Sequence, residues 1–152
     1  MSEIQLAGRV AVVTGAGQGM GRAIAQRLAA GGAKVAALDL NFEQAQESVA
    51  GCADPSVCMA YACNVSDSNA VNETFAAVES TLGPVSILVN NAGIGRAPGD
   101  GSDQMYELMG KRNEEIANGE EPKTHVDHIA FMEDEGWRGV MAVNLDGPFY
   151  CT

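Results

Sequence analysis

The chain has 152 residues, of which 46% are hydrophobic, and a formal net charge of −11. This size and composition fit one soluble domain, and the excess of acid argues against nucleic acids and anionic membrane surfaces as partners. No apolar run approaches the ~20 residues of a membrane span and no basic, apolar leader opens the chain, so we expect a cytoplasmic protein with reduced cysteines.

Four short apolar runs alternate with amphipathic helical stretches up to residue 93. Glycines 31 and 32 end the first predicted helix, Asn41 and Gln44 are spaced as a capping box for the second, and Ser66 is placed to cap the third. The expected strands are 9–15, 34–40, 57–65 and 85–93. Buried strands separated by helices predict an α/β fold, a doubly wound parallel sheet with helices on both faces.

The character of the sequence changes at Ile94, where glycine, methionine and charged residues become frequent. Ser102 or Asp103 is placed to cap a helix running to about Asn118, and a second short helical piece is expected over 126–135. A segment this long between core elements is usually a functional lid or a disordered linker.

The side chains of this segment leave its role open. His125, Asp127 and His128 lack a further partner, so we expect no metal site. Six apolar residues fit two roles equally, lining a bulky apolar substrate or packing over the sheet edge. They are Met105, Leu108, Met109, Ile129, Phe131 and Met132.

The turn after the first expected strand reads TGAGQGMG. It matches GxGxxG imperfectly, because Met20 replaces the last glycine, but it fits TGxxxGxG through Thr14, Gly15, Gly19 and Gly21. Such glycines allow a tight turn, let the backbone approach a pyrophosphate, and open a helix whose N-terminus attracts negative charge. A glycine-rich turn without a ligand is the alternative, but the position between a strand and a helix favours dinucleotide binding.

Asp39 stands at the end of the second expected strand. A carboxylate there accepts hydrogen bonds from the adenosine ribose hydroxyls and repels a 2′-phosphate. Gln18 before Gly19 and Leu40 after Asp39 give such a phosphate no cation, which favours NAD. Arg22 lies beside the turn and keeps NADP open as an alternative.

These motifs together resemble the short-chain dehydrogenases/reductases, a family with a Rossmann-like fold. Besides TGxxxGxG, the chain has NNAG at 90–93, CNVSD at 63–67, where the family usually has aspartate in place of Asn64, and Trp137, Val140 and Asn144 in the family's asparagine-helix pattern. The resemblance implies a catalytic role for Asn144, whose backbone carbonyl holds a water. It implies cofactor binding by Thr14, Gly15, Gly17, Gln18, Gly19, Met20, Gly21, Asp39, Leu40, Asn64, Val65, Asn91, Ala92 and Gly93.

The chain departs from the family pattern in two ways. The interval between Asn91 and Asn144 is roughly twice the usual one, so residues 96–131 resemble an insertion. The family's serine and YxxxK lie beyond its asparagine helix, and no tyrosine here has lysine four residues later. We therefore expect residues 1–152 to be an incomplete dinucleotide-binding domain, truncated after about four strands, inactive alone and binding NAD weakly at most.

The resemblance implies that the full-length protein is an NAD-dependent oxidoreductase. It would transfer a hydride between the cofactor and a small-molecule secondary alcohol or ketone, and it would form a homo-oligomer, a dimer or tetramer, through the helix begun at Gly136. The alternative is a non-catalytic short form that binds NAD or a protein partner.

Overall fold

A computed structural model describes residues 6–152, so the first five residues of the expected domain lie outside the described part. The described chain divides into two compact units. The sheet unit comprises the residues up to Gly93 together with Val143–Thr152, and the helical unit comprises Ile94–Ala142.

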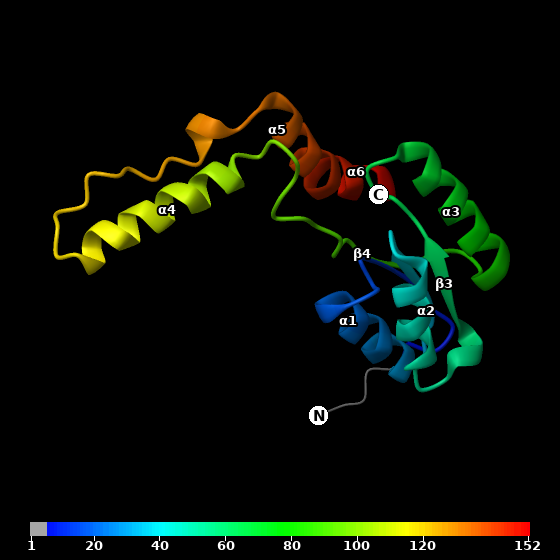
Figure 1. Ribbon diagram of the computed structural model, residues 1–152. Helices are drawn as coiled ribbons and strands as arrows, with labels where there is room; N and C mark the ends of the chain where they lie inside the picture. Colours follow the sequence, from blue (N-terminus) through cyan, green and yellow to red (C-terminus); the bar gives the residue numbers. More distant parts are fainter. Residues whose placement is uncertain (1–5) are drawn as a thin grey trace. The chain divides into compact units, whose positions relative to one another are not determined.

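The sheet unit contains a four-stranded parallel sheet (Figure 1). Its order is β3-β2-β1-β4, with bounds Cys58–Ala62, Lys34–Asp39, Val10–Thr14 and Ile87–Val89. The register pairs Thr14 with Leu38 and Asp39 with Ala62, so the carboxyl ends of β1, β2 and β3 meet at one edge. The expected parallel sheet and Rossmann-like fold are confirmed.

Helices cover both faces of this sheet, because alternate strand residues point to opposite sides. Val12 and Leu38 belong to a cluster covered by α3 (Ser68–Leu82) and α6 (Gly147–Cys151). Val13 and Val35 belong to the opposite cluster, covered by α1 (Gly19–Ala30) and α2 (Phe42–Ala50). All four cysteines are free and buried, two in each cluster.

Two of the strands are markedly shorter than predicted, each for its own reason. The expected strand 57–65 stops at Ala62, the partner of Asp39, and Pro55–Val57 forms a 3-10 turn before it. The expected strand 85–93 is reduced to β4, because residues 91 and 92 turn to hydrogen-bond the side chain of Thr14 instead of continuing the ladder.

One predicted N-terminal cap is confirmed and two are wrong. Asn41 caps α2 by accepting from the Gln44 N–H, 3.1 Å away. Asp67, not Ser66, caps α3, because its carboxylate accepts from two backbone N–H groups while the Ser66 hydroxyl donates to Asn64. Gly101, not Ser102 or Asp103, is the N-cap residue of α4 (Ser102–Ala117), with the left-handed φ of 81°.

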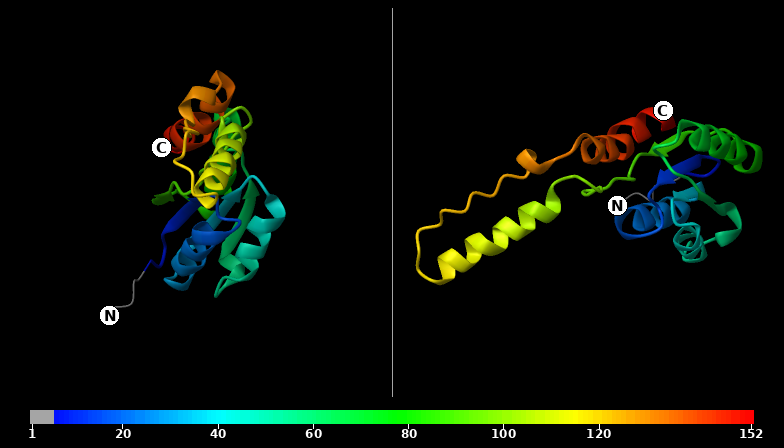
Figure 2. Two further views of the ribbon diagram at one scale, coloured as in Figure 1. Left: turned by 60° about the vertical axis from the view of Figure 1, so that its left-hand side comes forward. Right: turned by 45° about the horizontal axis from the view of Figure 1, so that its top comes forward.

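The helical unit is built on α4 and an extended segment that returns beside it (Figure 2). The Glu115 carboxylate accepts from the N–H groups of Lys123 and Thr124, at 2.9 and 3.1 Å, which fixes the returning segment to the helix. Hydrogen bonds from Thr124 lower the pKa of Glu115. Within residues 126–135, the expected helix is only the 3-10 turn Ile129–Phe131 and the start of α5 (Asp134–Met141).

Candidate functional site

The glycine-rich turn is shaped by backbone constraints that only glycine meets. Gly15 and Gly19 have φ of 61° and 54°, in the left-handed region. A Cβ on Gly15 would lie 2.8 Å from the Ala92 Cα, and one on Gly21 would collide with the Gly15 carbonyl oxygen. Gly15 therefore lets the segment after β4 approach the turn, and Gly21 lets α1 pack against it.

Thr14 and Asn91 join this turn to the segment that follows β4. The Thr14 hydroxyl oxygen accepts from the N–H groups of Asn91 and Ala92, both at 3.0 Å. The Asn91 side-chain amide donates to the carbonyls of Thr14 and Gly15, at 3.0 and 3.1 Å. The two sequence motifs thus form one hydrogen-bonded structure.

The N-terminus of α1 is suited to an anion. Among the described residues, no side chain caps it and no acidic residue lies in its first turn. A Cβ on Gly19 would meet no atom within 4 Å, so the turn faces open space there. Uncapped N–H groups and the helix dipole attract phosphate, so the residues present fit the pyrophosphate of a dinucleotide.

Asp39 lies at the end of β2, next to the turn. Its Oδ2 accepts from the Gly17 N–H at 2.8 Å and its Oδ1 from the Asn41 N–H at 2.9 Å. A carboxylate has about four lone-pair sites, so two such bonds orient the group and leave acceptor capacity for a ribose diol. Asn41 N–H thus bonds Asp39 rather than Gln44, and the reciprocal bond of the expected capping box is not formed.

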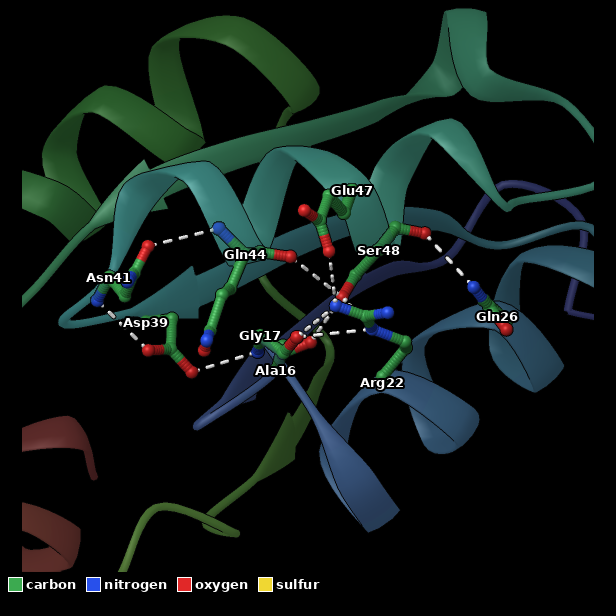
Figure 3. A network of polar contacts seen from close by, with 9 residues as sticks. All are labelled: Ala16, Gly17, Arg22, Gln26, Asp39, Asn41, Gln44, Glu47 and Ser48. Atoms are coloured by element: carbon green, nitrogen blue, oxygen red, sulfur yellow. Dashed lines mark hydrogen bonds and ion pairs between the residues drawn. The ribbon is translucent and has the colours of Figure 1, made fainter.

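Arg22 is engaged by three groups (Figure 3). Its guanidinium donates to the Gly17 carbonyl, to the Ser48 hydroxyl at 2.9 Å and to the Glu47 carboxylate at 3.0 Å. The sequence alone indicates only a phosphate-binding role for Arg22 and does not reveal these partners. The signal was Ser48, a polar residue three positions after Ala45 and so on the core side of an amphipathic helix.

The remaining predicted cofactor residues differ in exposure. Asn64 is exposed and its side-chain carbonyl accepts from the N–H and hydroxyl of Ser66, whereas the Val65 side chain is packed in the core. Only the backbone of Val65 is therefore suited to contact a cofactor. Gln18, Met20, Leu40 and Gly93 are exposed.

Asn144 lies in the middle of a π-helical stretch, Ala142–Asp146. A Cβ built on Gly93 would lie 3.2 Å from the Asn144 Oδ1, so this side chain is next to the end of the NNAG motif. A π-helix interrupts the regular i→i−4 ladder and is frequent at functional sites. Its widened turn is compatible with a backbone carbonyl that binds water.

The helical unit has a hollow of its own, of about 500 Å³, lined partly by Arg96, Asp100, Asp103 and Glu133. Arg96 pairs with Asp103 at 2.6 Å, and hydrogen bonds from Ser102 lower the pKa of Asp100. None of the predicted cofactor residues lines this hollow. Within residues 6–152 no group of three or more His, Cys, Asp or Glu is arranged to hold a metal, and no helix there is long and apolar enough to cross a bilayer.

Comparison with known proteins adds independent findings. A family model described as short chain dehydrogenase matches residues 9–152. The 2,3-dihydro-2,3-dihydroxybenzoate dehydrogenase of Bacillus subtilis is 42% identical over 143 residues, covering 93% of this chain and 44% of the relative. The D-threitol dehydrogenase of Mycolicibacterium smegmatis is 36% identical over 148 residues, covering 97% of this chain and 46% of the relative.

A solved structure agrees with these matches. The 3-ketoacyl-(acyl-carrier-protein) reductase of Brucella melitensis, complexed with NADH, superposes with a TM-score of 0.70 at 29% identity, covering 97% of this chain and 48% of that one. The chain therefore spans about half the length of the proteins it matches.

Proposed function

The chain belongs to the short-chain dehydrogenase family, and on that premise we propose that the whole protein is an NAD-dependent oxidoreductase. In this proposal a hydride passes between nicotinamide and a secondary alcohol or ketone. The relatives described as dehydrogenases and the neighbour solved with NADH support the reaction class. The single observation that carries the choice of cofactor is the Asp39 carboxylate held beside the glycine turn by the Gly17 N–H.

Each part of the site has a separate task in this proposal. The N-terminus of α1 and Gly19 hold the pyrophosphate, Asp39 accepts from the ribose hydroxyls, and Thr14 and Asn91 keep the turn in place. Bound nicotinamide supplies the hydride acceptor or donor. Asn144 holds a water through its backbone carbonyl in the π-helical stretch.

Proton transfer to or from the substrate needs a general acid or base. Tyr61 and Tyr106 are followed four residues later by Val65 and Gly110, so neither begins a YxxxK motif. We propose that this group belongs to the remainder of the whole protein, and that residues 1–152 alone bind the cofactor without turnover.

Two further features of the whole protein remain proposals. Leu145 and Phe149 are 57% and 77% exposed and four residues apart, so they form an apolar strip suited to association between copies.

The helical unit, which includes the predicted insertion 96–131, exposes Met109, Ile116 and Phe131, a composition suited to a bulky apolar substrate.

The proposed function is tested by steady-state kinetics of the whole protein with NAD and NADP on a series of secondary alcohols. We expect turnover with NAD to be much faster than with NADP, and Asp39→Ala to narrow the difference. Faster turnover with NADP would contradict the choice of cofactor. NADH binding without turnover of any alcohol or ketone would favour the non-catalytic alternative.

A further inference from the structure

The side chain of Arg22 forms hydrogen bonds both to α2 and to the glycine-rich turn (Figure 3). Its Nε lies 3.0 Å from the Gly17 carbonyl oxygen and 2.9 Å from the Ser48 Oγ, and its Nη2 lies 3.0 Å from the Glu47 Oε2. Ser48 is fully buried, and its hydroxyl donates to the Ala16 carbonyl at 2.7 Å. Ser48 therefore contacts Ala16 of the turn directly. Ser48 and Glu47 are also both connected to Gly17 of the turn, through the guanidinium of Arg22.

Gly17 connects this arrangement to Asp39. Its carbonyl accepts from Arg22, and its N–H donates to the Asp39 Oδ2. Glycine has the least conformational restraint of any residue, so its orientation depends on such external contacts. The packing is also close, because a Cβ on Gly17 would lie 2.7 Å from the Asp39 Oδ2 and 2.9 Å from the Gln44 Cβ.

We propose that Arg22, held by Ser48 and Glu47, is a positioning residue that sets cofactor preference by acting through Gly17 on the Asp39 carboxylate. The proposal rests on the proposed function, because it assumes that Asp39 meets the cofactor ribose. Among the described residues, Arg22 is the only lysine or arginine whose side chain hydrogen-bonds to the turn 14–21.

Three possible roles of Arg22 predict different changes in one ratio, the dissociation constant of NADPH divided by that of NADH. A positioning role predicts that Arg22→Ala lowers the ratio, because a misplaced Asp39 loses the ribose diol and repels a 2′-phosphate less. A purely electrostatic role predicts a higher ratio, because removing a cation beside Asp39 increases the repulsion of that phosphate. A purely structural role weakens both cofactors alike and leaves the ratio unchanged.

The experiment measures dissociation constants of NADH and NADPH for the whole protein and its variants, with thermal unfolding to check the fold. Arg27→Ala is the matched control, because Arg27 lies on the same helix, is exposed and carries the same charge. Ser48→Ala is the second variant, since it removes a partner of Arg22 with no change of charge and little change of volume.

We expect Arg22→Ala to lower the ratio about tenfold, the size of a lost hydrogen bond to a charged group. Ser48→Ala should lower it by less, and Arg27→Ala should leave it unchanged. An unchanged or raised ratio in both Arg22→Ala and Ser48→Ala would overturn the positioning role while leaving the proposed function intact. If the unaltered protein bound neither nucleotide, both would be overturned.

Discussion

At the scale of single residues, two glycines of the turn are needed for different reasons. Gly19 has a left-handed φ of 54° and open space where a Cβ would be. Gly21 is buried, and a Cβ there would collide with the Gly15 carbonyl. The first glycine therefore faces the expected phosphate, and the second allows α1 to pack against the turn.

This difference predicts opposite effects for two substitutions to alanine. Gly19→Ala should cost only ~1 kcal/mol of folding free energy, from the left-handed backbone, yet weaken NADH binding strongly by filling the phosphate position. Gly21→Ala should cost ~3 kcal/mol or prevent folding, because its collision is with backbone. Denaturant unfolding and NADH titration of both variants check this. Equal destabilisation by the two changes, or normal NADH binding by Gly19→Ala, would contradict it.

The sequence allowed the positions of Thr14, Asp39 and Asn91 to be predicted, because each follows directly from a motif and a strand end. It did not allow the partners of Arg22 to be predicted. Glu47 and Ser48 are 25 and 26 residues away along the chain, and their contacts depend on how α2 packs against α1. Such long-range contacts leave only an indirect signal, here a polar residue on an apolar helix face.

At the scale of elements, the sequence predicted the helices α1 to α4 well and their first residues less well. Asn41 caps as expected, whereas Ser66 and Asp67 are adjacent residues that both carry capping side chains. The structure uses Asp67 because Ser66 is occupied by Asn64. At the start of α4, the Ser102 N–H donates to the Asp100 Oδ1 at 2.8 Å, and Asp100 precedes both residues that were expected to cap this helix.

The helical unit has a closed base from which α4 and the returning segment extend. At this base the Glu133 N–H donates to the Gly99 carbonyl at 2.8 Å, and the Ser102 hydroxyl lies 3.5 Å from the His128 Nε2. The two ends of the segment 103–127 therefore meet. Both hydrophobic clusters of the sheet unit are made entirely of its own residues.

These contacts predict that residues 103–127 can be replaced by a short glycine linker without unfolding the sheet unit. In the whole protein, we expect the melting temperature to change by no more than a few degrees and turnover of bulky apolar substrates to fall. Replacing residues 120–123 by four glycines is the control, because it alters the loop after α4 without shortening the segment. Loss of the cooperative unfolding transition would show that the sheet unit depends on this segment, and unchanged kinetics on every substrate would remove its proposed role.

At the scale of the whole molecule, the sequence predicted the class of fold, a parallel sheet with helices on both faces. Alternating apolar strands and amphipathic helices are sufficient to predict a parallel sheet, and the observed strand order is β3-β2-β1-β4. The expected insertion, residues 96–131, lies within the helical unit Ile94–Ala142, which also includes α5, and its status as an insertion stays a prediction. The boundary between the two units falls where α5 continues directly into the π-helical stretch. The sequence pattern of Trp137, Val140 and Asn144 runs across this point without a break, so it gives no sign of the boundary.

We propose that the carboxyl edge of this sheet binds a nicotinamide dinucleotide through the glycine turn and Asp39. The most direct test is to titrate the isotopically labelled chain with NADH and to follow backbone amide shifts by NMR. We predict the largest chemical-shift changes at the amides of Gly17, Gly19 and Gly21. The amides of Asp39 and Asn41 should change over the same range of NADH concentrations. Chemical-shift changes confined to the helical unit, or none at all in a chain whose spectrum shows a folded sheet unit, would show that the glycine turn is not the cofactor site.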